Sequence, residues 1–122
     1  MSTATAHRIA LVVTSKLEDA GRSAIYRALM FAQELRDAGD DACIVFEGAG
    51  STAAAALAAP DHPMHRLFAD VRPLVRGTCR YCARAYGVLD TLEEAGLPLL
   101  GEDRGHASLR ALLAEGRQIV TF

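Results

Sequence analysis

A continuous apolar run near the start of the chain constrains the fold most strongly. Residues 8–14 contain β-branched side chains and show no alternation between polar and apolar positions. This pattern is typical of a strand buried on both faces of a parallel sheet. A second such run, Ala42–Phe46, follows a segment with apolar residues at helical spacing that stops at Gly39. The order predicts a strand, a covering helix and a second strand parallel to the first.

The rest of the chain continues this alternation. Helices are expected over residues 53–59, 65–71, 82–86, 89–95 and 108–115, and strands within 71–78, 97–100 and 118–122. The pattern predicts an α/β fold of three layers, αβα, with a mostly parallel sheet of about five strands. Because no linker or repeat divides the 122 residues, we expect 1–122 to form a single domain.

Composition excludes several classes of protein. A net charge of −2 gives no reason to expect nucleic acid or an anionic membrane as partner. The apolar runs are too short to cross a bilayer, and Met1–His7 is too short and too polar for a secretory signal. We therefore expect a cytoplasmic protein. In that reducing compartment a close pair of cysteines indicates catalysis, redox chemistry or metal binding.

The pair Cys79 and Cys82 is the most distinctive chemical feature. It follows a predicted strand and opens a predicted helix, where thiolate is favoured over thiol. Residues 64–87 contain five arginines and one aspartate, and Arg76, Arg80 and Arg84 lie nearest the pair. If these guanidinium groups face the sulfurs, they lower the thiol pKa further. The alternative is two buried cysteines beside a solvated basic face.

The third cysteine, Cys43, lies between apolar neighbours in a predicted strand, and we expect it in the core. The segment Gly48–Ala53, with Gly48, Gly50 and Ser51, matches the alanine-ending form of the dinucleotide fingerprint. It follows the second predicted strand instead of the first, which favours a loop that simply turns the chain. Such a loop can still hold a small anion at a helix start. It belongs to the edge where parallel sheets place their ligands, as does Cys79.

A metal site is the alternative use of the thiols. His62 and His65 together with Cys79 and Cys82 offer four ligands for tetrahedral zinc, although the histidine spacing departs from that of a zinc finger. Otherwise we expect no cofactor. The two remaining histidines, His7 and His106, are isolated in the sequence and are expected at the surface.

The order of these segments resembles the DsrE/DsrF family of sulfur-relay proteins. The resemblance rests on residues 9–14, 28–35 with Ala38 and Gly39, 45–48, 79–88 and 119–122. It implies the YchN-like fold, a relative of the flavodoxin and Rossmann sheets. It also implies association into homo-oligomers, trimers or hexamers.

The resemblance also implies a function. In the sulfur-carrying members a cysteine stands eight residues before a glycine-valine pair, as Cys79 does before Gly87 and Val88. Cys79 is thereby expected to carry a persulfide between sulfur donor and acceptor proteins. Cys82 departs from the pattern, because a second thiol can resolve or modulate the persulfide. The alternatives are a dithiol redox protein, or a non-catalytic oligomeric module that binds zinc or a small anion.

Overall fold

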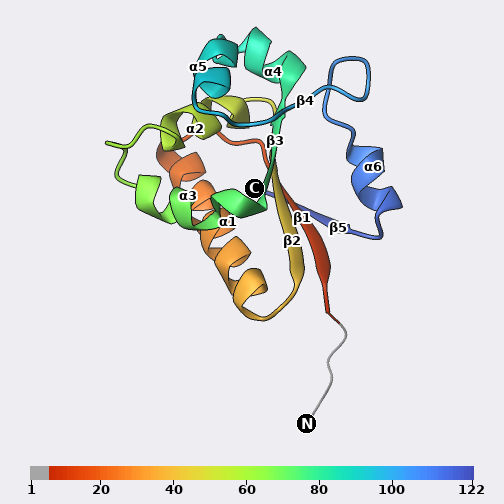
Figure 1. Cartoon of the computed structure of the whole chain (residues 1–122). Helices are drawn as coiled ribbons and strands as arrows, with labels where there is room; N and C mark the ends of the chain where they lie inside the picture. The colour runs from red at the N-terminus through yellow and green to blue at the C-terminus, as the bar shows by residue number, and fades with distance from the viewer. Residues whose placement is uncertain (1–5) are drawn as a thin grey trace.

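A five-stranded parallel sheet forms the middle layer of the protein. The structure is a computed structural model that describes residues 6–122, so most of the segment considered above as a targeting signal lies outside the described residues. The strand order is β4-β3-β2-β1-β5, and every neighbouring pair is parallel (Figure 1). The strands are β1 (Arg8–Val13), β2 (Asp41–Phe46), β3 (Val75–Cys79), β4 (Leu99–Leu100) and β5 (Gln118–Thr121). The predicted α/β fold class is confirmed.

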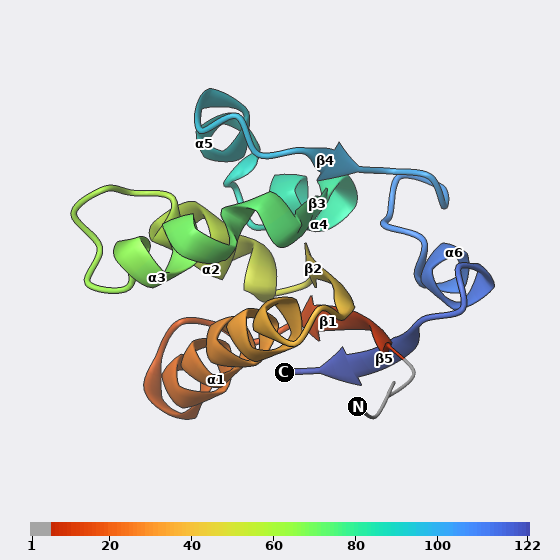
Figure 2. The same cartoon turned by 60° about the horizontal axis from the view of Figure 1, so that its bottom comes forward.

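Helices cover both faces of the sheet. They are α1 (Asp19–Asp37), α2 (Gly50–Leu57), α3 (His65–Val71), α4 (Arg80–Ala85), α5 (Leu89–Glu94) and α6 (Leu109–Ala114), with a 3-10 turn at Arg72–Leu74. Figure 2 shows α1, α2 and α3 on one side of the sheet and α6 on the other. Helices α4 and α5 lie beyond the end of β3. None of the helices in the described part of the chain is long and apolar enough to cross a membrane.

The side chains of β1 explain why its sequence shows no alternation. Ile9, Leu11 and Val13 point into the larger core cluster, where they pack with residues of α1, α2 and α3. Ala10 and Val12 point the other way, into a smaller cluster that includes Leu112 of α6. Since both faces of the strand are buried, apolar side chains are needed at successive positions.

Helix α1 forms as its apolar spacing predicts. Its buried side chains are Ile25, Ala28, Leu29, Ala32 and Leu35, which recur every three or four residues and face the sheet. The helix ends before Gly39, which has a φ of 83°. That left-handed conformation is the usual helix stop and is readily adopted only by glycine. The predicted helix end is confirmed.

The pairing of β3 with β4 depends on Gly77. A Cβ atom at this position would lie 2.7 Å from the backbone oxygen of Pro98 and 2.9 Å from Cγ of Leu100. The main chain of the segment entering β4 therefore comes closer to β3 than any larger residue would allow. Thr78, the next residue, donates its backbone N–H to Pro98 O at 2.9 Å.

A network of charged side chains joins the end of α6 to the first residues of β2 and β3. Arg117 is only 7% exposed, and it pairs with Asp41 at 3.1 Å and with Glu115 at 2.8 Å. Glu115 also receives two hydrogen bonds from Arg76, at 2.6 and 2.9 Å. The guanidinium of Arg76 and then that of Arg117 lower the pKa of Glu115 to about 2.

We predict that Gly77→Ala destabilises the protein by about 1 to 3 kcal/mol, because the new methyl group clashes with the backbone of Pro98 and the side chain of Leu100. Urea unfolding of the purified chain measures the change. Gly101→Ala is the matched control, since a Cβ there would lie 3.5 Å from the nearest atom, Gly105 O, which is ordinary contact. Equal stability of the two variants would contradict the close approach at Gly77.

We also predict a pH dependence of stability to which Glu115 contributes. Its pKa is about 2 in the folded chain against 4.5 for the free side chain, so its contribution to stability is complete above pH 4.5. The contribution is lost as the pH falls from 4.5 towards 2. Glu115→Gln should therefore be less stable than the parent at pH 6, and the difference should shrink at pH 3. Thermal unfolding at both pH values tests this, and an unchanged difference would refute it.

Candidate thiol site

The thiol site lies where three parallel strands end at one edge of the sheet. Val13 pairs with Phe46, and Phe46 pairs with Thr78, so β1, β2 and β3 end in register. Cys79 is the last residue of β3, and Cys82 lies in the first turn of α4. The loop that begins at Gly48 follows β2 and reaches the same edge. The expectation that this loop and Cys79 lie together is confirmed.

The two sulfurs differ in their access to solvent. Cys79 is 1% exposed, whereas Cys82 is half-buried, and both are free thiols. Burial raises the pKa of Cys82, and the neighbouring thiol of Cys79 raises it further, while a hydrogen bond from the backbone N–H of Gly48 acts in the opposite direction. The sequence predicts a favoured thiolate for at least one of the two sulfurs, and Cys82 is not that sulfur. Its loss of hydration outweighs the hydrogen bond from Gly48.

His106 approaches Cys79 from a distant part of the chain. Its Nδ1 lies 3.5 Å from Cys79 Sγ, within hydrogen-bonding range for sulfur. Which atom donates depends on the tautomer of the ring. The expectation that His106 is an isolated surface residue is wrong, because the ring is half-buried against the thiol site.

A tight turn holds His106 in this position. Asp103 and His106 form an antiparallel bridge with two backbone hydrogen bonds of 2.8 and 2.9 Å. The two residues between them, Arg104 and Gly105, have φ values of 52° and 89°. Positive φ at both central positions is the pattern of a type I′ hairpin turn. We call residues 103–106 the histidine turn.

The segment between the two cysteines is attached to the histidine turn. Tyr81 donates its backbone N–H to Gly105 O at 3.0 Å. Its ring stacks on the imidazole of His106, with centroids 4.2 Å apart and planes inclined by 30°. No sequence pattern singles out Tyr81, which lies between Cys79 and Cys82. Its contacts hold α4 against the histidine turn.

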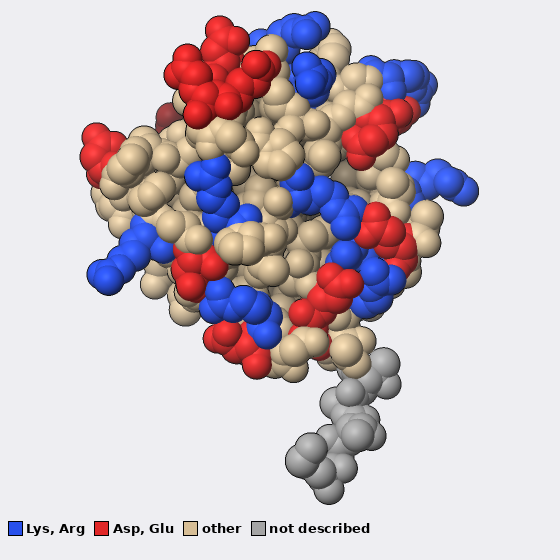
Figure 3. Space-filling model, in the orientation of Figure 1, with Lys and Arg blue, Asp and Glu red and all other residues tan. Residues whose placement is uncertain are grey.

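The arginines do not gather around the sulfurs. Arg76 binds Glu115, as described above, and Arg80 packs its Cδ near Gly101. Arg80 and Arg84 are exposed, and within the described chain neither forms an ion pair. Figure 3 shows positive and negative side chains interspersed over one face of the molecule. No arginine is among the main groups that shift the pKa of Cys82, so the expected basic environment does not form around that thiol in the described chain.

The glycine loop has a packing role that the structure makes plain. A Cβ on Gly50 would lie 2.0 Å from Val13 O, so only glycine lets α2 start directly over the end of β1. Gly48 has a φ of 58° and turns the chain after β2. Ser51 is buried, and its hydroxyl donates a hydrogen bond to Gly48 O at 2.7 Å. The same hydroxyl lies 3.5 Å from Cys82 O, a second and longer hydrogen bond. The loop touches the thiol site through these contacts.

The structure does not bring His62 and His65 to the cysteines. His62 Nδ1 accepts a hydrogen bond from the backbone N–H of Met64, and His65 Nδ1 lies 2.8 Å from Leu57 O of α2. Cys43 is buried in β2, as expected. Burial raises the pKa of Cys43, against the opposing effect of Arg117 and Arg76.

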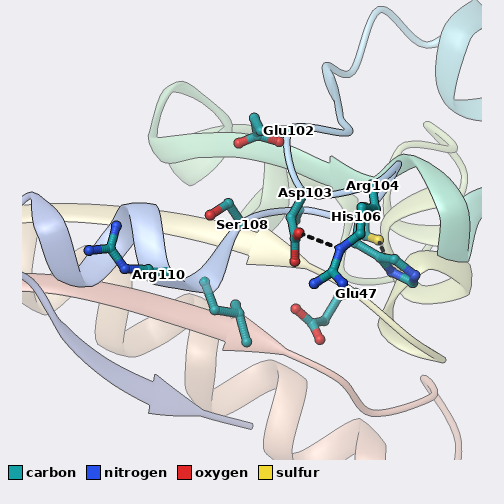
Figure 4. Close-up of a pocket in the computed structure, with 10 residues that line it drawn as sticks. Glu47, Glu102, Asp103, Arg104, His106, Ser108 and Arg110 are labelled. Atoms are coloured by element: carbon teal, nitrogen blue, oxygen red, sulfur yellow. Dashed lines mark hydrogen bonds and ion pairs between the residues drawn. The ribbon is translucent and has the colours of Figure 1, made fainter.

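A pocket of about 550 Å³ opens beside Cys79. Figure 4 shows Glu47, Asp103, Arg104 and His106 grouped at one end of it. Arg104 pairs with Asp103 at 3.0 Å, so its charge is partly compensated. The lining thus combines one thiol, one imidazole and side chains of both charges.

Three groups of the site come close enough to act together. The sulfurs of Cys79 and Cys82 and a ring nitrogen of His106 all lie within 4.8 Å of one another. Such a cluster can transfer a proton from thiol to imidazole, form a bond between the two sulfurs, or bind a soft cation.

Comparison with known proteins supports the fold and leaves the activity open. No protein-family model matches the chain. It is 32% identical over 92 residues to the uncharacterized protein MJ0733 of Methanocaldococcus jannaschii, a match that covers 75% of this chain and 74% of that protein. The solved structure of BT1422, a conserved protein of unknown function from Bacteroides thetaiotaomicron, superposes with a TM-score of 0.66 at 15% identity, over 93% of this chain and 94% of that one.

We predict that alkylation distinguishes Cys82 from Cys43. Cys82 should react faster with iodoacetamide, because it is half-buried while Cys43 is buried in the core. The alkylation rate of Cys82 should keep rising above the pH at which an ordinary thiol is fully ionised, because the pKa of Cys82 is raised. Peptide mapping by mass spectrometry of the reduced chain measures each rate. Modification of Cys43 as fast as Cys82 would contradict the difference in access.

Proposed function

The chain belongs to the family of the uncharacterized archaeal protein MJ0733, and from the geometry of the thiol site we propose that it is a small cytoplasmic sulfur-transfer protein of the DsrE/DsrF type. In this proposal Cys79 carries a sulfane sulfur as a persulfide, and Cys82 resolves or modulates it. The observation that carries the proposal is the 3.5 Å contact between Cys79 Sγ and His106 Nδ1, with a second thiol alongside.

His106 provides a route for the thiol proton. In the tautomer that carries its proton on Nε2, Nδ1 accepts the proton of Cys79 and leaves a thiolate, which is the nucleophilic form. The stack on Tyr81 and the backbone bonds of the histidine turn keep the imidazole aimed at the sulfur. A positioned base at hydrogen-bonding distance is the usual means of activating a cysteine nucleophile.

The transfer step balances without an external oxidant. The Cys79 thiolate attacks the outer sulfur of a donor persulfide, a new S–S bond forms on Cys79, and the S–S bond of the donor breaks. The donor leaves as a thiolate. Because Cys79 lines the pocket, the donor's outer sulfur reaches it from that side.

Two reactions can then remove the sulfur. The thiolate of an acceptor protein can attack the terminal sulfur, which regenerates the Cys79 thiolate. Alternatively, the Cys82 thiolate can attack Cys79 Sγ, which releases sulfide and leaves a Cys79–Cys82 disulfide that a thiol reductant must reset. The raised pKa of Cys82 slows the second reaction, since less of that thiol is ionised.

The proposal includes sulfur donor and acceptor proteins as partners and a homo-oligomer, a trimer or hexamer, as the active form. Large apolar side chains support self-association: Tyr26 and Met30 are exposed on α1, and Leu109 and Leu113 on α6. Exposed apolar groups at helical spacing are typical of surfaces that pack against another chain.

The prediction is that the reduced, chelator-treated chain gains one sulfur on Cys79 when incubated with glutathione persulfide. Cys79→Ser should abolish the gain, and Cys82→Ser should prolong it, because the attack that releases sulfide is lost. Cys43→Ser is the matched control and should behave as the parent. Intact-mass and peptide mass spectrometry provide the readout.

Two outcomes would overturn the assignment. Sulfur that accumulates on Cys82 instead of Cys79 would remove Cys79 as the carrier. The dithiol redox alternative would be favoured by two results together. The parent would form a Cys79–Cys82 disulfide without any persulfide, and Cys82→Ser would gain no sulfur on Cys79.

A further inference from the structure

We propose that Cys79, Cys82 and His106 form a binding site for a single Zn²⁺ ion, with a fourth coordination position open to the adjacent pocket. This inference goes beyond sulfur transfer and does not rest on it, because the ligand geometry is its only premise. It also replaces the set that the sequence suggested, in which His62 and His65 completed the site.

The spacing of the ligand atoms fits a tetrahedral ion. Zinc binds cysteine sulfur at about 2.3 Å and histidine nitrogen at about 2.0–2.1 Å, which places neighbouring ligand atoms about 3.5–3.8 Å apart in a tetrahedron. Cys79 Sγ and His106 Nδ1 are 3.5 Å apart, and all three ligand atoms lie within 4.8 Å of one another. An ion therefore needs only small side-chain adjustments to bind all three.

The three ligands come from elements that other interactions already hold in place. Cys79 ends β3 within the sheet, and Cys82 lies on the helix that follows it. His106 is fixed by the histidine turn, by the stack on Tyr81, and by the bond from Tyr81 N–H to Gly105 O. Ligands held in this way lose little conformational freedom on binding, which raises affinity.

The chemistry of the donors selects the class of cation. Two thiolates and an imidazole are soft or intermediate ligands and favour zinc over magnesium or calcium, which prefer oxygen. Binding releases two thiol protons to solvent as two Zn–S bonds and one Zn–N bond form and water leaves the ion. No oxidation state changes.

The fourth position is open because the described chain supplies only three ligands to this cluster. The pocket lining carries the carboxylates of Glu47, Glu102 and Asp103, and Asp103 already binds Arg104 (Figure 4). Three protein ligands with an exchangeable fourth is the arrangement of zinc sites that bind substrate or water, whereas structural sites use four protein ligands. We assign the position to water or to a small thiol from the pocket.

Zinc and sulfur transfer exclude each other at these residues. A thiolate bound to zinc has its lone pair engaged, so it does not attack a donor persulfide while the ion is present. The metal-loaded and metal-free forms are therefore separate states of one site, and each can be prepared and measured alone.

The test is a titration of the reduced, chelator-treated chain with Co²⁺, a spectroscopic substitute for zinc. One equivalent should produce the sulfur-to-cobalt charge-transfer band and the visible bands of tetrahedral cobalt, and added Zn²⁺ should displace it. His106→Ala should weaken binding by more than the roughly 10- to 100-fold that the loss of an outer-sphere partner costs. His65→Ala and Cys43→Ser are matched controls and should bind as the parent.

A second variant guards against misfolding. His106→Cys restores a ligand at the same position and should recover tetrahedral cobalt binding, and circular dichroism of both His106 variants without metal checks the fold. The proposal is overturned if the parent shows no tetrahedral cobalt spectrum, or if His106→Ala, folded, binds as tightly as the parent. Persulfide formation on the metal-free chain is a separate readout. Cobalt binding therefore tests the zinc site, and persulfide formation tests sulfur transfer, each independently of the other.

Discussion

The parallel register of β1, β2 and β3 is the constraint on which the thiol site depends. Because Val13, Phe46 and Thr78 lie side by side, the three strands end at one edge, and the residues that follow them meet there. A slip of β3 by one residue would turn Cys79 to the opposite face. The sulfur would then point towards the core under α1, and its contact with His106 would be lost.

The regular elements were predictable because their patterns are local. The unbroken apolar runs of β1 and β2 and the spacing in α1 each report burial within a few residues, and the structure contains all three. The pairing partner of Cys79 was not predictable in this way. His106 lies 27 residues further along, and only the folded chain brings it to the sulfur. The sole local signal was Asp103-Arg104-Gly105-His106, which resembles a tight turn and hence a fixed histidine.

Two features of the sequence have roles that only the fold explains. Arg76 is three residues before Cys79 in an extended strand, a separation of about 10 Å along the sheet, so closeness in sequence did not mean closeness to the sulfur. It instead reaches Glu115 at the other end of β3. The glycine motif has a packing role, because Val13 O leaves no room for a Cβ atom on Gly50. In both cases a neighbour from another element decided the role.

The state of the thiols follows from how the site balances burial against charge. Without a cation, burial raises the pKa of Cys82, and no described arginine pairs with the site to compensate. The histidine turn places the imidazole of His106 against Cys79 Sγ, and in the proposed function that ring accepts the thiol proton. A bound divalent cation reverses this balance, because it supplies the missing positive charge directly and a coordinating thiol is deprotonated outright. In the two proposals, the same three side chains therefore serve either as a nucleophilic site, in which the imidazole has taken the proton of Cys79, or as a set of zinc ligands. The choice between them depends on which ligand reaches the pocket.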